Sequence, residues 1–295
     1  MKTALVTGSE GFAGRHYVQA LEERGYEVYG IDPAHGSNRA DALDYFASSN
    51  VGWDLVIHCA AVVGGRAVID GDPLTQVVNI QLDAAMFRWA MRVKPGRTVY
   101  ISSSAAYPSY LQELSLRHNL EEFRIDPSFT FPSVGTPDQL YGWAKLIGEN
   151  LAWRARQAGL KVTVIRPFSG YGEDQDPAYP FRAFAERAKR REDPFRIWGS
   201  AVQCRDFIHI DDIVAATLLM CDEGLDGPVN LGTGRATTMA QLARVFTTQA
   251  GYSPLLETVK DAPMGVGYRV ADVTALSEFY TPKVTLEEGV RRALA

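Results

Sequence analysis

The sequence is short of several features that mark particular classes of protein. It has three cysteines in 295 residues, Cys59, Cys204 and Cys221, an odd number at wide spacing. This favours reduced, mostly buried thiols in a cytoplasmic protein over a disulfide framework, and it suggests no metal site. No run approaches the ~20 apolar residues of a membrane span. The first residues read as a strand and lack the pattern of a signal peptide.

An excess of charge of one sign is also missing. The net charge is −5, and 22% of the residues are charged. We therefore expect neither nucleic acid nor a membrane surface as a partner. The apolar content of 46% is ordinary for a globular enzyme, and the length suggests about two domains.

Short β-branched runs alternate with helical periods over the first two-thirds of the chain. This pattern predicts an α/β fold with a parallel sheet covered on both faces. Strands are expected at 3–6, 27–31, 55–58, 97–101, 161–165 and 228–231, and helices at 12–24, 74–91, 138–157, 213–221 and 239–250.

A glycine-rich turn lies between the first expected strand and the first expected helix. Gly8 permits the tight turn, Gly11 lets backbone approach a pyrophosphate, and Gly14 lets the helix pack close on the strand. The amides of Phe12 and Ala13 open the helix, whose dipole favours a phosphate. The turn therefore predicts a dinucleotide site on a Rossmann-like doubly wound sheet.

Asp32, at the end of the second expected strand, bears on the choice of dinucleotide. Its carboxylate is placed to accept hydrogen bonds from the adenosine ribose, and it would repel the extra phosphate of NADP. NAD is therefore the expected cofactor, although the nearby Arg39 keeps NADP open as an alternative. Asp41 and Ala42 are expected to approach the adenine.

The segment YGWAK places Tyr141 and Lys145 one turn apart on one face of a helix. Thr136 is expected to cap this helix, with Pro137 at its first position and Gln139 completing a T-x-x-Q capping box. The Tyr–Lys match alone decides little, since it should arise by chance in roughly one such chain in three.

A cluster of hydroxyls precedes this helix in the segment RTVYISSSAAYP. In an open parallel sheet, ligands bind at the carboxyl ends of the strands. Strand, serine cluster and Tyr–Lys helix thus follow one another in the order needed to converge over a nicotinamide. Alone, a serine-rich strand end is more often a turn that satisfies its own backbone.

Five motifs together resemble the extended short-chain dehydrogenase/reductase family, in its nucleotide-sugar branch: TGSEGFAG, SSSAAYP, YGWAK, RPFSGYG and RDFIHIDDIVAA. The resemblance covers nearly the whole chain. It implies that Tyr141 is the catalytic base, Lys145 its activator and Ser103 the hydroxyl partner. Ser103 matches because it lies four residues before Tyr107, while Ser102 and Ser104 stay possible.

The same resemblance implies a wider set of contacts. NAD would be held by the glycine turn, Asp32, Ala60, Ala61, Tyr141, Lys145 and Pro167, and a nucleotide-diphosphate sugar by Ser103, Ser104, Tyr141 and Arg205. Residues 1–167, with 209–232 returning to them, would form the dinucleotide-binding domain, and 168–208 with 233–295 a smaller substrate-binding lobe.

Two further expectations concern the segment HIDDIVAA, where the chain leaves the lobe, and the oligomeric state that the resemblance implies. Asp211 or Asp212 is expected to cap the next helix, with His209 structural. A homodimer is expected through the helices at 138–157 and 74–91, with Trp143, Met86 and Trp89 on their exposed faces.

The chemistry agrees with these residue types. A phenol is a poor base at neutral pH, but two neighbouring positive charges, Lys145 and an oxidised nicotinamide, favour the phenolate of Tyr141. It can then take the proton of a sugar hydroxyl while the adjacent carbon gives hydride to the cofactor. Ser103 would hydrogen-bond the same oxygen.

The residues after Ser103 narrow the reaction. Sugar dehydratases of the branch carry an Asp–Glu pair there and 3,5-epimerising members a cysteine, whereas this chain has Ser104 and Ala105. C4 epimerisation through a 4-keto intermediate, with NAD recycled, is therefore predicted. The alternatives are an NAD(P)H-dependent 4-keto-sugar reductase, which AAVVGG and SSAAYP resemble, a dehydratase, and a non-catalytic dinucleotide sensor.

Overall fold

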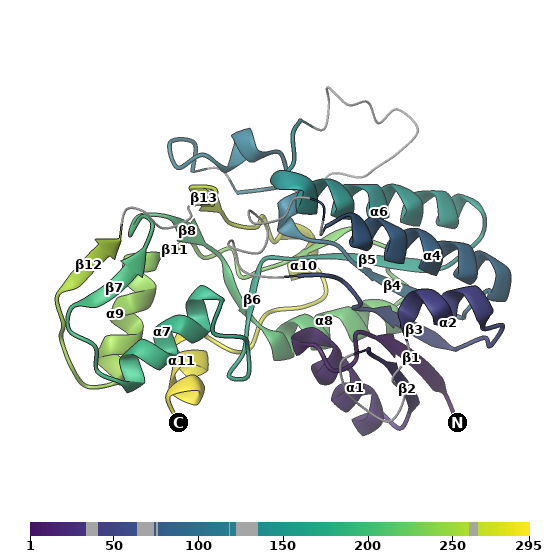
Figure 1. The fold of residues 1–295 in the computed structure, drawn as a ribbon, viewed down its shortest axis with the longest axis horizontal. Helices are drawn as coiled ribbons and strands as arrows, with labels where there is room; N and C mark the ends of the chain where they lie inside the picture. Colours follow the sequence, from purple (N-terminus) through teal and green to yellow (C-terminus); the bar gives the residue numbers. More distant parts are fainter. Residues whose placement is uncertain (34–40, 64–73, 75, 118, 122–134, 260–264) are drawn as a thin grey trace.

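The computed structural model describes residues 1–33, 41–63, 74, 76–117, 119–121, 135–259 and 265–295. Six strands form a parallel sheet in the order β10-β5-β4-β3-β1-β2 (Figure 1). They are β1 (Thr3–Thr7), β2 (Glu27–Ile31), β3 (Leu55–His58), β4 (Thr98–Ile101), β5 (Val162–Pro167) and β10 (Val229–Leu231). The order runs outward from β1 in both directions, which confirms the predicted doubly wound, Rossmann-like fold.

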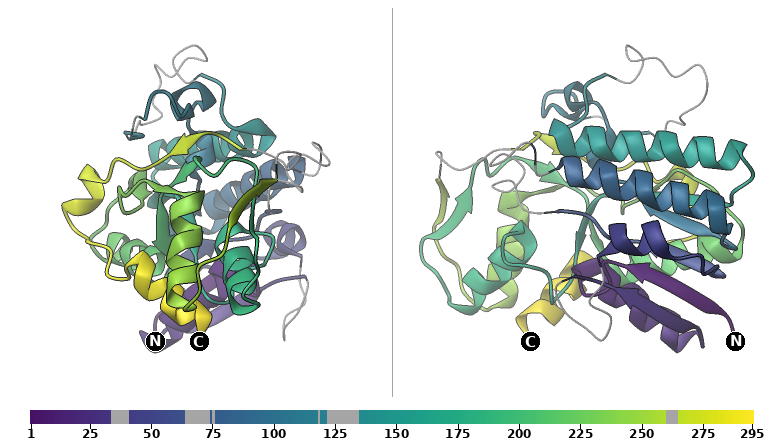
Figure 2. Two further views of the ribbon diagram at one scale, coloured as in Figure 1. Left: turned by 90° about the vertical axis from the view of Figure 1, so that its left-hand side faces the viewer. Right: turned by 45° about the vertical axis from the view of Figure 1, so that its right-hand side comes forward.

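Helices cover both faces of this sheet (Figure 2). One face carries α2 (Ala42–Ser48), α4 (Val77–Val93) and α6 (Gln139–Gln157), and the other carries α1 (Phe12–Glu23) and α8 (Ile210–Asp222). We call the sheet and these helices the sheet domain. Because both faces are covered, its strands are continuous apolar runs such as the fully buried Leu55–His58.

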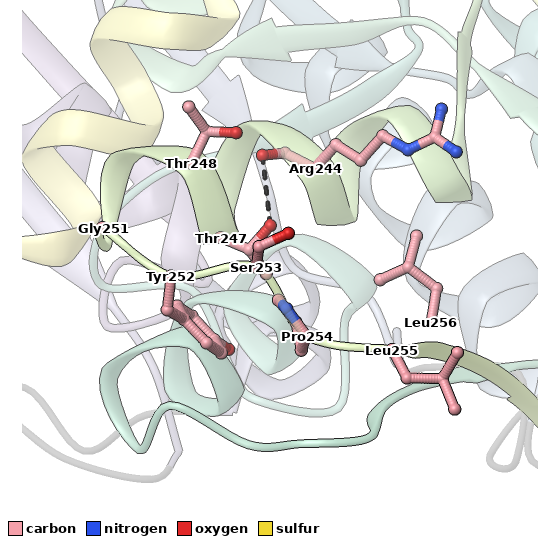
Figure 3. Close-up of a pocket in the computed structure, with 9 residues that line it drawn as sticks. All are labelled: Arg244, Thr247, Thr248, Gly251, Tyr252, Ser253, Pro254, Leu255 and Leu256. Carbon is pink, nitrogen blue, oxygen red and sulfur yellow. Dashed lines mark hydrogen bonds between the residues drawn. The ribbon is translucent and has the colours of Figure 1, made fainter.

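Most of the remaining elements form a smaller unit, which we call the lobe. It contains β6 (Ser169–Tyr171), α7 (Pro180–Lys189), β7 (Phe195–Trp198), β8 (Cys204–Arg205), β9 (Phe207–His209), β11 (Thr237–Thr238), α9 (Met239–Gln249), β12 (Leu256–Val259), β13 (Tyr268–Arg269) and α11 (Leu286–Leu294). Helix α10 (Thr274–Ser277) instead packs on β10, with Leu276 in the core of the sheet domain. Strands β11, β8 and β13 make a three-stranded sheet. A hollow of about 820 Å³ lies between the end of α9 and β12 (Figure 3).

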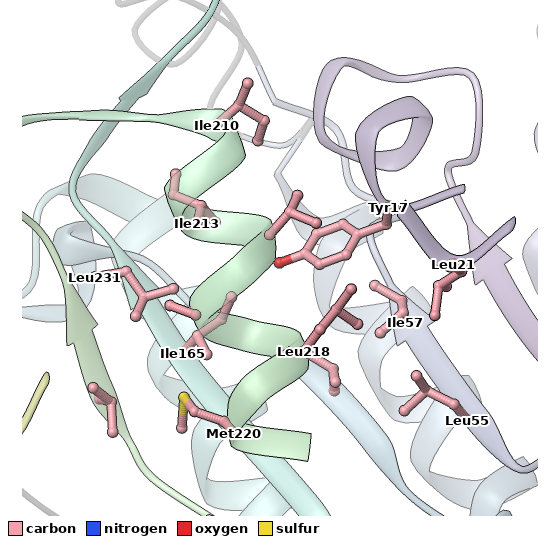
Figure 4. Packing of buried hydrophobic residues seen from close by; sticks show 14 of the residues in the cluster. Tyr17, Leu21, Leu55, Ile57, Ile165, Ile210, Ile213, Leu218, Met220 and Leu231 are labelled. Carbon is pink, nitrogen blue, oxygen red and sulfur yellow. The ribbon is translucent and has the colours of Figure 1, made fainter. Parts of the chain in front are cut away.

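Separate apolar cores lie on the two faces of the sheet and in the lobe. In the sheet domain, Tyr17 and Leu21 of α1 pack with Ile213 and Leu218 of α8 against the strands (Figure 4). The core of the lobe is rich in aromatic rings, including Phe181, Phe184, Phe195 and Phe246. Each such fully buried side chain stabilises the fold by roughly 1.5–3 kcal/mol before entropy is counted.

Both capping predictions are wrong. Helix α6 begins at Gln139 with Asp138 as its N-cap residue, so the Thr136–Gln139 capping box does not form. The Asp138 carboxylate pairs instead with Arg269 of the lobe. Helix α8 begins at Ile210, and the ring of His209, rather than an aspartate, accepts the amide of Asp211. At α8 the cap is thus the residue before the helix, and at α6 the N-cap side chain is drawn away from the helix amides to Arg269.

The expected exposure of α4 is also wrong. Met86 and Trp89 are fully buried, and the Trp89 ring lies 5.3 Å from that of Phe46. The reason is that α4 lies between α2 and α6 and not at the edge of its layer. Trp143 of α6 is half-buried beside Leu146.

The three cysteines are all free thiols, with Cys204 buried and the other two half-buried. Burial raises the pKa of the Cys59 thiol to about 12, so it stays protonated and unreactive at neutral pH. In the part of the chain that the structure describes, none of the helices combines the length and the apolar character needed to cross a bilayer.

Candidate active site

The glycine turn has the geometry that a pyrophosphate site requires. Gly8 has a φ of +68°, and a Cβ placed on it would lie 2.8 Å from the amide nitrogen of Ala60. A Cβ on Gly14 would overlap the carbonyl of Gly8. The Gly8 amide donates to Ile31 at the end of β2, at 2.7 Å. The turn is thus closed against β2 and β3, with no room for a side chain at Gly8 or Gly14, which fits a bound dinucleotide.

Asp32 lies beside this turn, as predicted. It is 9% exposed, and its Oδ2 accepts from the Glu10 amide at 3.2 Å. Asp41 caps α2 by accepting from the Leu43 amide at 2.7 Å, and Ala42 is buried. Their approach to the adenine stays a prediction, and Arg39 lies outside the described residues.

Lys145 lies on helix α6, and its side chain reaches the end of β4. Its Nζ donates to the carbonyl of Ile101 at 2.9 Å and lies 5.7 Å from the ring centre of Tyr141. The side chain is almost buried, at 5% exposure. An ammonium has three donors, so this contact leaves others for a ligand. The structure therefore brings the predicted Tyr141 and Lys145 together at the carboxyl end of β4.

The three serines after β4 have different surroundings. Ser102 is buried and donates to Glu149. Ser103 is half-buried, and its Oγ accepts from the Ala105 amide at 3.1 Å, which leaves its own proton for another acceptor. Ser104 is 5% exposed. These environments favour Ser103 as the hydroxyl that meets a ligand.

The start of α6 rests directly on the loop that follows these serines. The Asp138 amide donates to the carbonyl of Ala105 at 3.0 Å. A Cβ on Gly142 would overlap that same carbonyl. Glycine at this position thus lets the helix approach closely enough to put Tyr141 at the same junction as Ser103. Gly142 follows Tyr141 directly in the YGWAK motif, so the glycine itself was a visible sign of this close approach.

A buried ionic network below this junction was missed by the sequence analysis. Arg166, at the end of β5, donates to both carboxylate oxygens of Glu149, at 2.8 and 2.6 Å. It also donates to the hydroxyl of Tyr107 at 3.2 Å, which in turn donates to Asn230 at 2.7 Å. Burial would lower the pKa of Arg166, but Glu149 and Tyr107 raise it above its ordinary value.

A second buried network connects the catalytic helix with the glycine turn. The Tyr100 hydroxyl donates to Asp83 at 2.7 Å, and the other oxygen of Asp83 lies 3.3 Å from Nε2 of His58. His58 Nδ1 is 2.8 Å from the hydroxyl of Thr7, the residue before Gly8. The Tyr100 ring itself lies 5.5 Å from Nζ of Lys145.

Tyr179, the residue before α7, is a further neighbour of Tyr141 that the sequence did not single out. Burial raises its pKa to about 12, and the nearby Tyr141 and Asp176 add to the shift. Its phenol therefore keeps its proton at neutral pH. Only the folding of the lobe over the sheet domain brings this side chain near the catalytic helix.

Arg205 is half-buried on β8, where it donates to the carbonyl of Cys204 at 2.8 Å. The following Asp206 is fully buried and accepts from the amides of Thr233 and Gly234. Burial raises the pKa of this carboxyl, against the effect of these hydrogen bonds.

The other implied contacts lie at strand ends. Pro167 ends β5, and Ala60 and Ala61 follow β3, so all three are at the carboxyl edge of the sheet. None of the predicted site residues lines the hollow of the lobe, whose walls are Arg244, Thr247, Thr248 and 251–256 (Figure 3).

Comparisons with known proteins show which family the chain resembles over most of its length. Residues 4–232 match the sequence model of the NAD dependent epimerase/dehydratase family. The chain is 26% identical to a putative UDP-glucose 4-epimerase of Methanocaldococcus jannaschii, over 98% of this chain and 96% of that protein. It is 27% identical to a dTDP-4-dehydro-6-deoxy-D-allose reductase of Streptomyces bikiniensis, over 94% and 90%. A crystal structure of UDP-glucose 4-epimerase from Thermotoga maritima, with UDP-glucose, has a TM-score of 0.78 and 27% identity, covering 99% of this chain and 97% of that one.

Proposed function

The chain belongs to the NAD dependent epimerase/dehydratase family, and on that basis we propose that it inverts C4 of a nucleotide sugar. NAD is its cofactor. The observation that carries the proposal is that Tyr141 and Lys145 meet residues 102–107, which follow β4 and which we call the serine loop. Bound NAD would accept a hydride from the sugar carbon and return it to the opposite face.

The residues of the site divide this chemistry among them. Tyr141 removes the proton of the 4-hydroxyl as the general base, and Lys145, whose Nζ lies 5.7 Å from the ring centre of Tyr141, is its positively charged neighbour. Ser103 donates a hydrogen bond to the same oxygen as it becomes a carbonyl. The glycine turn binds the pyrophosphate, and Asp32 the adenosine ribose.

A second candidate is the reduction of a 4-keto sugar, which the similarity to the Streptomyces reductase favours. Ser104 and Ala105 argue against dehydration because neither can act as an acid or base there. Absorbance at 340 nm separates the two candidates. Epimerisation recycles NAD and gives no net change, whereas reduction consumes NAD(P)H. Dinucleotide binding without turnover of any nucleotide sugar would indicate a sensor.

Replacing the base tests the assignment. Tyr141→Phe should lower kcat about 10²–10⁴-fold, because general base catalysis is lost. NAD binding, measured by calorimetry, should persist. Substrates would be a panel of UDP-, GDP- and dTDP-sugars with products resolved by NMR. Tyr26→Phe, at the turn between α1 and β2, is the matched control. Full activity of Tyr141→Phe would refute the proposal.

The lobe is proposed to bind the substrate. Arg205 would contact the diphosphate with a planar, doubly donating guanidinium, and Ser104 the sugar. In this division residues 1–167 and 209–232 hold NAD, while 168–208 and 233–295 hold the nucleotide sugar. Arg205→Ala should then raise KM more than it lowers kcat.

A cytoplasmic homodimer completes the proposal. Helices α4 and α6 expose Val78, Met91 and Ile147, each 36–38% accessible, which supports a helical interface in place of the buried Met86 and Trp89. The three free thiols are compatible with a reducing compartment. A monomer in sedimentation at micromolar concentration would contradict the dimer.

A further inference from the structure

Arg269 of strand β13 reaches out of the lobe to the catalytic region. Its guanidinium donates to the carboxylate of Asp138 at 2.7 Å and to the side-chain oxygen of Gln112. The side chains of Arg269 and Asp138 are only 14% and 11% exposed. A charge-assisted bond of this length, largely shielded from water, is stronger than a surface ion pair.

Each partner of Arg269 holds one catalytic segment. Asp138 is the N-cap residue of α6, three positions before Tyr141, and its amide donates to the carbonyl of Ala105 in the serine loop. Gln112 is fully buried and donates to the carbonyls of Tyr107 and Pro108, at 3.0 and 3.2 Å, where the same loop ends. One side chain of the lobe therefore fastens both the helix and the loop.

The backbone between these contacts needs such a restraint. Gln139, the first residue of α6, has a φ of +59°, in the left-handed region that side chains other than glycine rarely adopt. Such a strained conformation persists only when its surroundings hold it. Asp138, immediately before it, is held at its amide by Ala105 and at its carboxylate by Arg269.

The same strand lies next to the proposed phosphate contact. Strands β13 and β8 pair in parallel with Arg269 opposite Arg205, and the Asp206 amide donates to the carbonyl of Arg269 at 3.1 Å. The strand pair that would receive the substrate diphosphate is thus joined, through one guanidinium, to both catalytic segments.

We propose that Arg269 is a positioning residue, which holds Tyr141 and Ser103 in register from the lobe through Asp138 and Gln112. The inference rests on the proposed function for the roles of Tyr141 and Ser103. It adds that the lobe sets the catalytic geometry as well as binding the sugar. A displacement of about 1 Å at such a site costs on the order of a hundredfold in rate.

Kinetics provide the first test. Arg269→Gln and Asp138→Asn should each lower kcat by about 10–100-fold, with KM and NAD affinity changed by less than threefold. The double variant should be no worse than the poorer single variant, because the two residues act as one unit. Arg235→Gln is the matched control, since it breaks a two-bond ion pair of the lobe with Glu287 that does not touch α6.

Hydrogen exchange of the NAD-bound protein provides a second test that needs no turnover. Arg269→Gln should speed exchange in residues 139–145 while residues 150–157 of the same helix keep the wild-type rate. Asp138→Asn, which keeps the size of the side chain, gives the same readout if Arg269→Gln does not fold.

The outcomes separate this inference from the proposed function. If kcat is unchanged in both single variants of an active enzyme, the positioning role of Arg269 is overturned. Unchanged hydrogen exchange at residues 139–145 would overturn it as well. A rise in KM alone would assign Arg269 to substrate binding and would equally overturn it. If the wild-type protein turns over no nucleotide sugar, the proposed function fails, while the exchange measurement still decides whether Arg269 holds the start of α6.

Discussion

An ion pair of the sheet domain and one of the lobe differ in how far their charged side chains are buried. Below the catalytic loop, Arg166 and Glu149 form an ion pair with side chains only 0% and 3% exposed. In the lobe, the pair of Arg196 and Glu257 is 63% and 51% exposed, and the core is apolar and aromatic. Burying charges costs solvation energy that an apolar core avoids. The comparison indicates that charges are buried, despite the loss of solvation energy, where they connect the serine loop with helix α6.

Breaking the buried pair should have the largest effect on stability. Glu149→Gln leaves the fully buried guanidinium of Arg166 without its counter-charge, and such changes cost about 3–5 kcal/mol. Urea unfolding followed by circular dichroism measures this loss.

A double variant separates charge from packing at the same place. Glu149→Leu with Arg166→Met removes both charges and should recover most of the stability, because no buried charge stays unpaired. It should not recover activity, since Ser102 loses its partner Glu149 and Tyr107 loses Arg166. A cost for Glu149→Gln as small as that of a surface pair would contradict the comparison.

His209, where the chain returns from the lobe to α8, should give an intermediate effect that depends on pH. Burial lowers the pKa of this imidazole, but Asp211 and Glu173 outweigh burial and Arg292, so the net shift is upward from 6.5. Its Nδ1 lies 3.2 Å from the Asp211 amide and 3.3 Å from the Asp211 carboxylate, so it accepts from the first when neutral and donates to the second when charged.

The sign of the pH dependence follows from that upward shift. A raised pKa in the folded state stabilises the protein fully below about pH 6.5, and this contribution is lost as the pH rises through the folded value. Thermal unfolding between pH 6 and 8 should show a decline that His209→Gln flattens. The same slope in both proteins would assign the decline to other groups.

The exposed pair of the lobe should have the smallest effect. Arg196→Ala is expected to cost about 0.5 kcal/mol or less, because solvent screens this pair and ordering two long side chains offsets their attraction. Urea unfolding under the conditions used for Glu149→Gln makes the two values comparable. A loss of several kcal/mol here would remove the contrast between the two regions.

The elements with strong local patterns were predicted closely. Strands β2 and β3 occupy the predicted residues 27–31 and 55–58. Strand β3 is buried along its whole length, as expected of a parallel strand that is covered on both faces. Helix starts were predicted less well. At Asp138 the decisive neighbour is Arg269, 131 residues away in the sequence. At His209 the neighbours are the carboxylates of Asp211 and Glu173. No local capping rule includes such partners.

The candidate site divides in the same way. Tyr141 and Lys145 are neighbours on any helix because a turn has 3.6 residues. By contrast, Glu149 and Arg166 carry no signal in the sequence that they meet, and neither do Asp138 and Arg269. Tyr179 comes near Tyr141 only because the lobe folds over the sheet domain.

The sequence by itself determined the alternation of strands and helices, the glycines that close the first turn and the spacing of the phenol from the ammonium. These depend on backbone torsions and helical period, which act over a few residues. The tertiary structure alone decided which charges are buried, which carboxylate faces Arg269 and which serine keeps a free proton. Those outcomes depend on desolvation and on contacts between different elements of the fold, such as Arg166 with Glu149 and Arg269 with Asp138, which a local pattern does not encode.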